Sequence, residues 1–565
     1  MEHVLHFGLG AATEVTKAEI QFPSGKKIIL NHVPADQVLD LYESDAQPDP
    51  VKKETAPTLF TDISNQNGFR YTHVENEYID FKREPLLPYQ YSRKGPYYAM
   101  GDVNGDKRAD IYIGGAAGIA GKLMLQQADG KFTESNQAAF IKDKAQEDNG
   151  AVFFDADGDG DLDLYVVSGG GEFEAGSNLY QDRLYLNDGR GNFTRSPNAL
   201  PKESFNGSCV IALDFDGDGD MDLFIGGGTT PGRFPQHDNC ILLQNNKGQF
   251  TELTEMVAPN LNKQVGIVNA ASWADINGNK EPQLILAGEW MPISIFVMQE
   301  GKLTKQNANV TVQTPLAPRT DTLVKLDALT GWWNTVVAED IDHDGDLDLI
   351  VGNRGTNSRI SCDINQPCTI YAKDFDNNGS YDAVLGYYNR GKCYPMYSRD
   401  QLIDQMSFFR KRYYRYHQYA GQTLDELFSP EQKKGMDIFT TGCFESGVLL
   451  NNGDGSYHFI AFPERAQLST INDMVVDDID GDGIKDIVVC GNSYDADVAT
   501  GNYDATAALF LKGDGKGQFT AWLPGFAGLN IRGEARKLVY LKSNAGRSLI
   551  FLKNSAAAQV FSLKK

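Results

Sequence analysis

Five aspartates and four glycines crowd the stretch DFDGDGDMDLFIGG, residues 214–227. Asp214, Asp216, Asp218 and Asp222 stand at relative positions 1, 3, 5 and 9. Glycines between them can take positive φ and curl the chain, so that the oxygens point inward. An oxygen-only cage of this kind suits Ca²⁺, which takes about six to eight oxygen ligands. The alternative is a polar turn in which the aspartates supply only turn chemistry.

The same spacing recurs five more times, which favours metal binding over turn chemistry for the set. The copies are Asp102, Asn104, Asp106 and Asp110; Asp155, Asp157, Asp159 and Asp163; Asp340, Asp342, Asp344 and Asp348; Asp374, Asp376, Asn378 and Asp382; and Asp478, Asp480, Asp482 and Asp486. A seventh copy, from Asp275 to Gln283, has lost most of its charge. The sequence therefore predicts about six calcium sites, with the Asp275 copy empty or weak.

The copies do not fit the EF-hand, which needs a bidentate Glu at position 12 and a helix on each side. Position 12 is apolar here, as at Val166, Ile225 and Val351. The flanking runs are short and rich in β-branched and aromatic residues, as is typical of strands. We therefore expect calcium loops between two strands, with ligands at positions 1, 3, 5 and 9 and a backbone carbonyl near position 7.

The spacing of the loops predicts a repeat architecture. Loops begin at residues 102, 155, 214, 275 and 340, a period of 53–65 residues. Between them recurs an apolar run, a Gly-rich turn and a second apolar run, as in LYLNDGRGNFTR and ILLQNNKGQFTE. Such turns are a strong hairpin signal. Each period then contains four strands, which is one blade of a β-propeller.

Blade counting gives an all-β fold with seven blades, or eight if the Asp374 loop begins a blade of its own. The C-terminal stretch 535–565 is predicted to form a last blade that is one strand short, and residues 58–64 are expected to supply the missing strand. Residues 397–436 interrupt the pattern as a helical insertion, with Ser398 as a candidate N-cap. Their segment 408–419, FFRKRYYRYHQY, is either a lid for an anionic or sugar ligand or a bland insertion whose cations sit on the acidic propeller.

Composition excludes some classes of function. The formal charge of −24 and the pI of about 4.8 argue against nucleic acid as a partner. Six bound Ca²⁺ ions would offset roughly 12 of these negative charges. No apolar run is long enough to predict a transmembrane helix. Seven cysteines are too few and scattered for a disulfide scaffold; pairing of Cys362 with Cys368 and of Cys393 with Cys443 is weighed against free buried thiols.

The residues resemble a known family. Loops of the form DxDxDGxxD followed by an apolar strand and two glycines, as in DLFIGG, resemble the FG-GAP/VCBS repeats of integrin-like propellers. The stretch 1–45, with HFGLG and IQFPSGKKIIL, resembles the ASPIC/UnbV domain. With ENEYIDFKREPLLP and GWWN, the combination is similar to the cartilage-acidic-protein-like family of VCBS-repeat proteins common in Bacteroidetes.

The resemblance implies a domain plan and a location. We expect a partial ASPIC/UnbV β domain at 1–46, a linker at 47–57 and the propeller at 58–565 with its insertion at 397–436. An ASPIC/UnbV domain is normally longer, so Met1 is expected to follow a missing N-terminal part. The initial MEHVLHFGLG lacks the features of an export signal, but family members are typically exported. The protein is therefore expected outside the cell or at its surface.

The sequence contains none of the catalytic motifs GxSxG, HExxH and CxxC. The first hypothesis is a non-catalytic module that binds a glycan or a protein as part of a larger surface assembly. The alternative is a calcium-dependent polysaccharide lyase. We expect the segment 71–100 and the insertion 397–436 to approach each other and, with Arg83, Trp332 and Trp333, to border the ligand pocket. For the tryptophans, core packing is the competing interpretation.

Overall fold

The computed structural model describes residues 6–22, 26–48, 58–313, 321–543 and 546–564. The chain forms two compact units, Met1–Thr58 and Leu59–Lys565. In the first unit, β1 (Glu14–Gln21), β2 (Lys26–Pro34) and β3 (Gln47–Pro48) form an antiparallel sheet in that order, with a short 3-10 turn at Glu43–Asp45. Gln47 and Pro48, which we had placed in the linker, thus pair with β2. The rest of the predicted linker, 49–57, lies outside the described residues.

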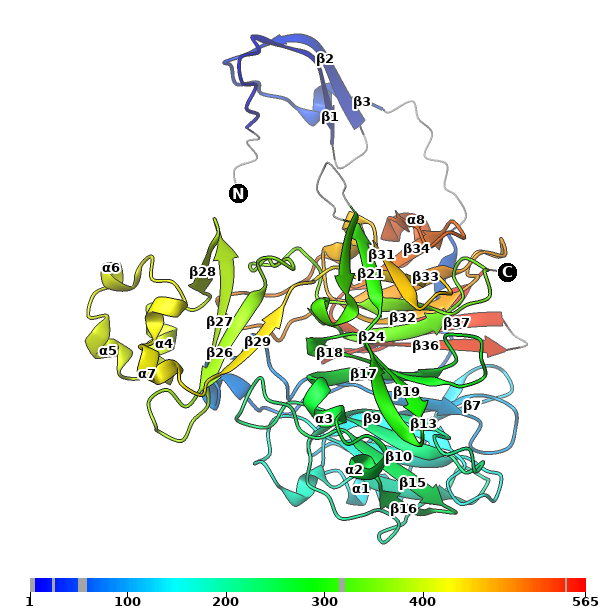
Figure 1. The fold of residues 1–565 in the computed structure, drawn as a ribbon. Helices are drawn as coiled ribbons and strands as arrows, with labels where there is room; N and C mark the ends of the chain where they lie inside the picture. The colour runs from blue at the N-terminus through cyan, green and yellow to red at the C-terminus, as the bar shows by residue number, and fades with distance from the viewer. Residues whose placement is uncertain (1–5, 23–25, 49–57, 314–320, 544–545, 565) are drawn as a thin grey trace. The chain divides into compact units, whose positions relative to one another are not determined.

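The second unit is built from successive sheets that are antiparallel except for one parallel strand pair (Figure 1). The first three are β5 (Tyr98–Gly101), β6 (Asp110–Ile113), β7 (Lys122–Gln126) and β8 (Phe132–Ser135); β9 (Asp148–Phe154), β10 (Asp163–Ser168), β11 (Arg183–Asn187) and β12 (Phe193–Arg195); and β13 (Gly207–Leu213), β14 (Asp222–Gly227), β15 (Ile241–Asn246) and β16 (Gln249–Glu252). The fourth is β17 (Ile267–Ala274), β18 (Gln283–Pro292), β19 (Ser294–Gln299) and β20 (Lys302–Gln306), with β23 (Thr330–Trp332) paired to β18.

The next three sheets follow the same plan. They are β24 (Thr335–Glu339), β25 (Asp348–Gly352), β30 (Gly447–Asn451) and β31 (Ser456–Ala461), extended by β21 (Asn309–Gln313) and β22 (Asp321–Lys325); β32 (Ile471–Asp477), β33 (Asp486–Gly491), β34 (Ala508–Gly513) and β35 (Phe519–Trp522); and β36 (Ala535–Ser543), β37 (Gly546–Lys553), β38 (Gln559–Leu563) and β4 (Phe60–Asp62). The strand–loop–strand unit and the second hairpin predicted from the sequence are therefore both present.

The sheets surround a common centre. Each first strand contacts the first strand of the next sheet, in the order β5, β9, β13, β17, β24, β32 and β36. The Tyr98 hydroxyl on β5 donates to the Leu538 carbonyl on β36 at 2.8 Å, which joins the last sheet to the first. Hydrophobic clusters fill the spaces between neighbouring sheets; one combines Leu184 of the second with Leu223 of the third. Because both faces are covered, a second strand such as β14 is buried along its length.

The sheet formed by the C-terminal strands is completed by an N-terminal strand, as predicted. Strand β4 pairs antiparallel with β38, with Leu563 opposite Phe60 and Phe561 opposite Asp62. Phe60 is 1% exposed and packs in a cluster with Phe510 of the preceding sheet. Burial of Phe60 therefore adds hydrophobic stabilisation to the hydrogen bonds of this strand.

The Asp374 loop belongs to an additional sheet. Strands β26 (Cys368–Lys373), β27 (Asp382–Asn389), β28 (Lys392–Pro395) and β29 (Asp437–Thr441) pair in the order β28-β27-β26-β29. In sequence they lie between β25 and β30, the second and third strands of the fifth sheet. Figure 1 shows this sheet and its helices projecting to one side of the other sheets.

Short helices form the rest of this insertion. They are α4 (Arg399–Gln405), α5 (Phe409–Arg412), α6 (Tyr416–Tyr419) and α7 (Pro430–Lys433). The predicted cap is confirmed, because the Ser398 side chain accepts from the Gln401 amide in a capping box. Elsewhere, α1 (Ala138–Lys142), α2 (Thr254–Val257), α3 (Leu261–Gln264) and α8 (Pro524–Ala527) are single turns. None of the helices in the described ranges is both long and apolar enough to cross a membrane.

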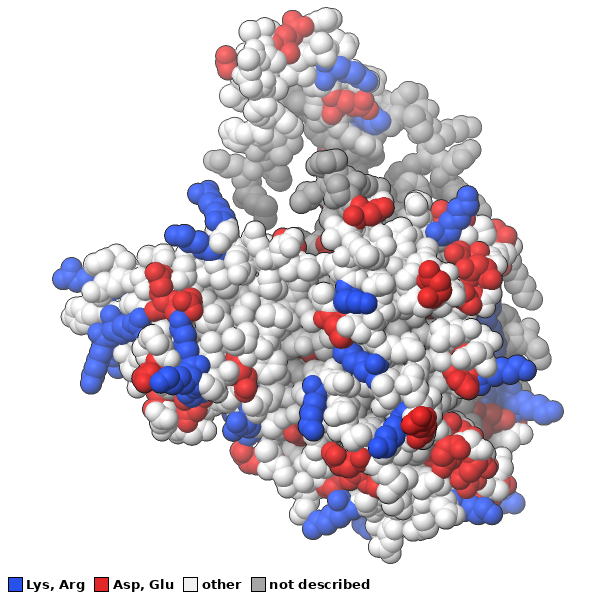
Figure 2. All heavy atoms as spheres, in the orientation of Figure 1, with Lys and Arg blue, Asp and Glu red and all other residues white. Residues whose placement is uncertain are grey.

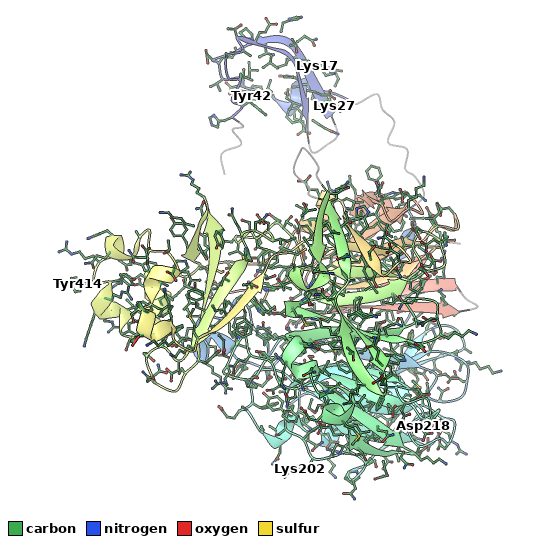
Figure 3. All side chains as sticks on the ribbon, in the orientation of Figure 1. Lys17, Lys27, Tyr42, Lys202, Asp218 and Tyr414 are labelled. Atoms are coloured by element: carbon green, nitrogen blue, oxygen red, sulfur yellow. The ribbon has the colours of Figure 1, made fainter. Side chains whose placement is uncertain are left out.

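The insertion packs against the segment that precedes β5, so the two non-repeating parts do approach each other. Leu402 and Phe409 share a hydrophobic cluster with Leu86, and the Tyr397 hydroxyl donates to the Leu86 carbonyl. Lys and Arg side chains stand out on the insertion in Figure 2. Tyr414, at its outer end in Figure 3, is 75% exposed.

The basic residues of the insertion bond largely within it. The Arg412 guanidinium donates to the carbonyls of Glu426 and Leu427, and Arg399 forms an ion pair with Asp400. The seven cysteines are free thiols, and a hydrogen bond with Cys368 together with burial raises the pKa of Cys362.

Candidate metal loops and central pocket

Each aspartate-rich motif forms the loop between two adjacent strands. Six of the seven motifs join the first and second strands of their sheets, and the Asp374 motif joins β26 to β27. The loops therefore occupy equivalent places in repeated units. This equivalence allows their geometry to be compared position by position.

Two left-handed residues give every loop its curl. Position 4 has positive φ in all seven loops and is occupied by Gly105, Gly158, Gly217, Gly278, His343, Asn377 and Gly481. Position 6 also has positive φ, at Gly160, Gly219, Gly345, Gly379 and Gly483, and at Lys107 and Lys280 in the two remaining loops. His343 is exposed at such a turn. Glycine is favoured there because it has no Cβ to clash in this conformation.

The first aspartate is held by the backbone that curls around it. In the Asp214 loop, one carboxylate oxygen accepts from the Gly217 amide at 2.7 Å and the other from the Gly219 amide at 3.2 Å. The Asp155 and Asp478 loops repeat both bonds at 2.7–3.1 Å. Position 1 is thus fixed by the backbone of its own loop.

The ninth residue anchors the loop to the sheet. Asp222 is fully buried, and its two oxygens accept from the amides of Phe215 at 3.2 Å and Asn245 at 2.7 Å. Burial raises the pKa of Asp222 to about 7, because an ionised carboxylate loses solvation there. Burial likewise raises the pKa to about 7 at Asp163 and to about 6 at Asp110, Asp348, Asp382 and Asp486.

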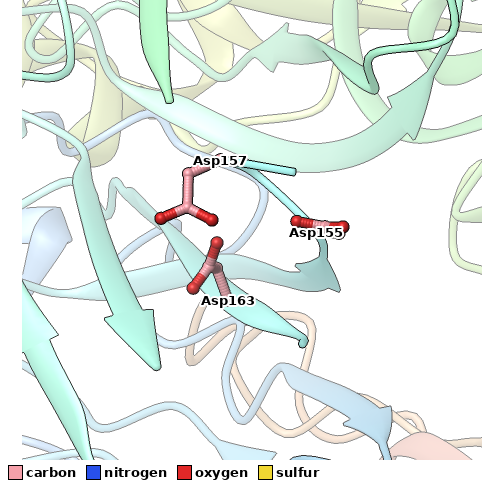
Figure 4. Close-up of side chains that lie close together, drawn as sticks. All are labelled: Asp155, Asp157 and Asp163. Carbon is pink, nitrogen blue, oxygen red and sulfur yellow. The ribbon is translucent and has the colours of Figure 1, made fainter. Parts of the chain in front are cut away.

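Five loops gather three carboxylates with ligand oxygens within 4.8 Å of one another. The groups are Asp155, Asp157 and Asp163; Asp214, Asp216 and Asp218; Asp340, Asp342 and Asp344; Asp374, Asp376 and Asp382; and Asp478, Asp480 and Asp486. Figure 4 shows the carboxylates of Asp157 and Asp163 facing each other beside Asp155. These clusters could hold metal ions.

The oxygens that lack partners support this. Within the clusters, Asp342 Oδ1 and Asp376 Oδ1 are buried without a hydrogen bond from any described residue. An unpaired buried carboxylate oxygen is costly. Oxygen donors in this number and with this charge are the set that a hard cation such as Ca²⁺ prefers. The residues present therefore fit the ion that the spacing predicts.

In two loops, a basic side chain contacts the aspartates. In the Asp102 loop, which is not among the five groups, the Arg108 guanidinium forms an ion pair with Asp106. In the Asp478 loop, the Lys512 ammonium contacts Asp480 and lies 2.7 Å from Asp482. Burial lowers the Lys512 pKa, but hydrogen bonds to these two aspartates outweigh it and raise the pKa.

Sequence reasoning did not identify the residue opposite position 3. Lys512 and its counterpart Gln244 stand at the same place on the third strand of their sheets, since Leu511 pairs with Ile487 as Leu243 pairs with Leu223. The Gln244 amide donates to Asp216 at 2.5 Å. The sequence did contain a signal for this residue. Gln244 and Lys512 each directly follow the three apolar residues that begin the second hairpin, ILL in ILLQNN and LFL in LFLKGD.

A pocket of about 70 Å³ opens at the common centre of the sheets. Trp332 lines it, together with Tyr89, Lys94 and Tyr97 of the segment 71–100. The other two predicted ligand residues lie elsewhere. Trp333 is 1% exposed in a hydrophobic cluster, and Arg83 pairs with Glu174 at 2.8 Å. The helical insertion does not contribute to the pocket lining.

Comparison with protein families agrees with the repeated loops. Residues 1–48 match the ASPIC and UnbV family model. Residues 102–166 and 172–225 match the FG-GAP-like repeat model, and these ranges include the Asp102, Asp155 and Asp214 loops. The chain contains FG-GAP-like repeats. The matched FG-GAP-like repeats and the ASPIC and UnbV segment together span less than half of the chain, and no curated protein matches it significantly.

Solved structures similar to this FG-GAP-repeat chain share little sequence with it. BBS1N in complex with ARL6DN is 10% identical with a TM-score of 0.37, over 90% of this chain and 98% of that one. The Dos1 propeller is 8% identical with a TM-score of 0.33, over 84% and 95%. The Bacillus licheniformis rhamnogalacturonan lyase PL11 is 11% identical with a TM-score of 0.27, over 84% and 90%. Similarity at this level carries no functional argument.

Proposed function

We propose that this protein is a calcium-stabilised β-propeller that acts as a non-catalytic module for binding a glycan or a protein. The observation that carries the calcium part is the repeated loop, in which the backbone already fixes the first and ninth aspartates while other carboxylate oxygens lack partners. A preformed, oxygen-lined loop loses little conformational entropy when the ion binds.

The propeller has seven blades in this proposal. The seven sheets whose first strands contact in order form the ring, and β4 completes the last blade. The Asp374 loop is a sixth ion site in the additional sheet. The domain plan is an N-terminal ASPIC/UnbV segment to residue 48, a connection at 49–57 and the propeller from residue 58.

The proposal places the protein outside the cell or at its surface. Calcium sites of extracellular modules often have dissociation constants of about 10⁻⁴–10⁻³ M, which suits millimolar free calcium. Loops that keep polar or cationic substitutions, such as the Asp102 loop with Arg108, are expected at the weak end of this range. Family resemblance supports the same location.

Calcium titration of the protein tests the proposal. Isothermal titration calorimetry after exhaustive chelation should give about five or six calcium ions per chain, and crystals grown with calcium should contain ions in the loops. A stoichiometry of zero or one would refute the calcium part. The non-catalytic part is tested by incubation with a panel of acidic polysaccharides, because a lyase releases unsaturated, ultraviolet-absorbing products and a binding module does not.

A further inference from the structure

The central pocket differs in charge from the rest of the molecule. The whole chain carries a formal charge of −24, yet none of the described residues that line the pocket is an aspartate or a glutamate. Four of them are basic: Lys94, Arg354, Arg536 and Lys537. They come from the segment before β5, from the end of β25 and from β36, so no single repeat produces this cluster.

Two of the four cations are neutralised inside the protein. The Lys94 ammonium lies 3.0 Å from a carboxylate oxygen of the buried Glu289. The Arg536 guanidinium lies 2.5 Å from Asp495 and 2.6 Å from Glu534. These pairs are structural, since each carboxylate is buried against its partner.

Arg354 and Lys537 form no ion pair with any carboxylate in the described ranges. Arg354 is only 9% exposed. Its guanidinium lies between two rings, 4.6 Å from the centre of Trp332 and 4.5 Å from that of Tyr503, and its Nε has no acceptor in the described structure. Cation–π contact offsets part of the cost of burial, but the N–H groups at the guanidinium edge still favour an anion.

Lys537, on β36, also lines the pocket. Its ammonium lies 5.4 Å from the centre of the Tyr97 ring. The nearby Asp473 accepts from the Leu538 amide at 3.0 Å, and burial raises the pKa of Asp473 despite the attraction of Lys537. Arg354 and Lys537 therefore place two cations without an ion-pair partner among the described residues in a partly enclosed pocket, where water screens them less than at the surface.

The remaining polar lining is neutral. Besides three tyrosines, it consists of Asn269, Asn334, Thr470, Asn472 and Ser493. The side-chain N–H groups of the three asparagines donate within the protein. The amide oxygens of Asn334 and Asn472 and the Ser493 hydroxyl are therefore the groups that can accept from hydroxyl groups of a ligand. A guanidinium edge, in turn, matches the two oxygens of a carboxylate.

We propose that this pocket binds one carboxylate-bearing, hydroxyl-rich residue, a uronic acid that is either free or at the end of an acidic glycan. Arg354 pairs with the carboxylate, Lys537 adds the second charge, and the side-chain oxygens of Asn334, Asn472 and Ser493 accept from the sugar hydroxyls. The inference names the ligand class of the binding module and thus rests on the proposed function. A volume of about 70 Å³ suits the acidic end of one sugar rather than a long chain.

Calorimetry on the calcium-saturated protein tests this with three matched probes. D-Galacturonate is expected to bind and D-galactose, which lacks only the carboxylate, is not. N-acetylglutamate has carboxylates without sugar hydroxyls and is expected to bind at least about tenfold more weakly than galacturonate, a difference of 1.4 kcal/mol. Equal binding of galactose, or equal binding of N-acetylglutamate, would overturn the inference. Trigalacturonate distinguishes the sources: tighter binding than the monomer indicates a chain end, and equal binding indicates the free acid.

Substitutions locate the site. Arg354→Gln is expected to weaken galacturonate binding at least about tenfold, and Arg354→Lys, which keeps the charge but not the planar stack, to weaken it less. Lys202→Gln removes the same charge from an exposed position (Figure 3) and should change nothing. Equal weakening by the Arg354 and Lys202 variants would contradict a specific site.

A second variant keeps the test decisive if Arg354→Gln destabilises the fold. If Arg354→Gln lowers the Tm, Lys537→Gln carries the test, because Lys537 is less buried. Failure of the inference is distinguishable from failure of the proposed function. A protein that binds calcium in its loops but shows no affinity for galacturonate would refute only the inference.

Discussion

The Asp214 and Asp275 loops have the same backbone and very different charge. Both have left-handed residues at positions 4 and 6, and both use position 9 to accept from the amide of position 2, through Asp222 at 3.2 Å and Gln283 at 2.8 Å. The Asp275 loop nevertheless has Asn277 and Asn279 where the other has aspartates. The loop conformation therefore does not require five carboxylates, and the surplus charge of the Asp214 loop must serve something beyond shape.

Removal of calcium should produce the largest effect. Chelation leaves the carboxylates of the five clusters without a cation that balances their charge. The Asp275 loop is expected to be unaffected, because it is predicted to bind calcium weakly or not at all. Ligand linkage gives about 2.7 kcal/mol per site at a hundredfold excess over Kd, so we expect EDTA to lower the Tm clearly. Differential scanning calorimetry with and without calcium measures this, with magnesium as the control. An unchanged Tm would mean that the additional carboxylates of the Asp214 loop do not contribute to calcium-dependent stability.

Exchange of charge between the two loops should exchange their calcium binding. Asp216→Asn with Asp218→Asn is expected to remove one ion from the calorimetric stoichiometry without unfolding the loop. Asn277→Asp, Asn279→Asp and Gln283→Asp together are expected to add one. If the second variant gains no ion, then the loop conformation, rather than charge, limits binding at Asp275.

A single side chain opposite position 3 should tune affinity. Lys512→Gln gives the Asp478 loop the residue that Gln244 supplies to the Asp214 loop, and we expect about tenfold tighter calcium binding because an ammonium no longer competes with the ion. Gln244→Lys is the reverse control and should weaken the Asp214 site. Terbium luminescence titration of the two variants measures both changes, and a shift of the same sign in both would contradict the interpretation.

The pH dependence of stability should reverse when calcium is added. Without the ion, the folded-state pKa of the position 9 aspartates is raised to about 6–7, above the usual value of about 3.9. Their stabilising contribution is then fully present below about pH 4 and is lost as the pH rises through 6–7. With saturating calcium the ionised form is required, so stability should fall as the pH drops.

Two melting series between pH 5 and pH 8 measure this reversal. Other buried carboxyl groups, such as Glu203 with its pKa raised by burial to about 9, contribute to both series. The difference between the series therefore isolates the loops. Parallel curves would contradict the assignment of position 9 to the ion site.

Substitutions at position 6 should have the smallest effect. Gly219 has a φ of 93° and Lys280 a φ of 68°, and a Cβ added at Gly219 would meet no neighbour. Gly219→Ala is therefore expected to destabilise by about 1 kcal/mol through backbone strain alone. Lys280→Gly relieves such strain and should be neutral or slightly stabilising. Urea unfolding in EDTA measures both, and a stabilising Gly219→Ala would contradict the shared conformation.

Local spacing was enough to predict the loops, the hairpins and the pairing of residues 58–64 with the last sheet. The loops and hairpins depend on residues that are close in sequence. The pairing of residues 58–64 was predicted because the last repeat lacks one strand. The place of the Asp374 loop could not be predicted, because strand–loop–strand units look alike whether they belong to the ring or to an inserted sheet. The charge of the central pocket was also missed, since Lys94, Arg354 and Lys537 are scattered over more than four hundred residues and meet only when the ring closes.

The pairing of β4 with β38 also constrains how the molecule can assemble. Phe60 and Leu563 are partners although nearly the whole unit lies between them in sequence. Such a contact carries a large loop-closure entropy and belongs to the slow, non-local class of folding events. Blades in the middle of the chain can form from neighbours as soon as they emerge from the ribosome, but the final strand pairing has to wait for the last residues. Until then one hydrophobic edge of the ring stays open, and this edge is where a partly synthesised chain is most exposed to misassembly.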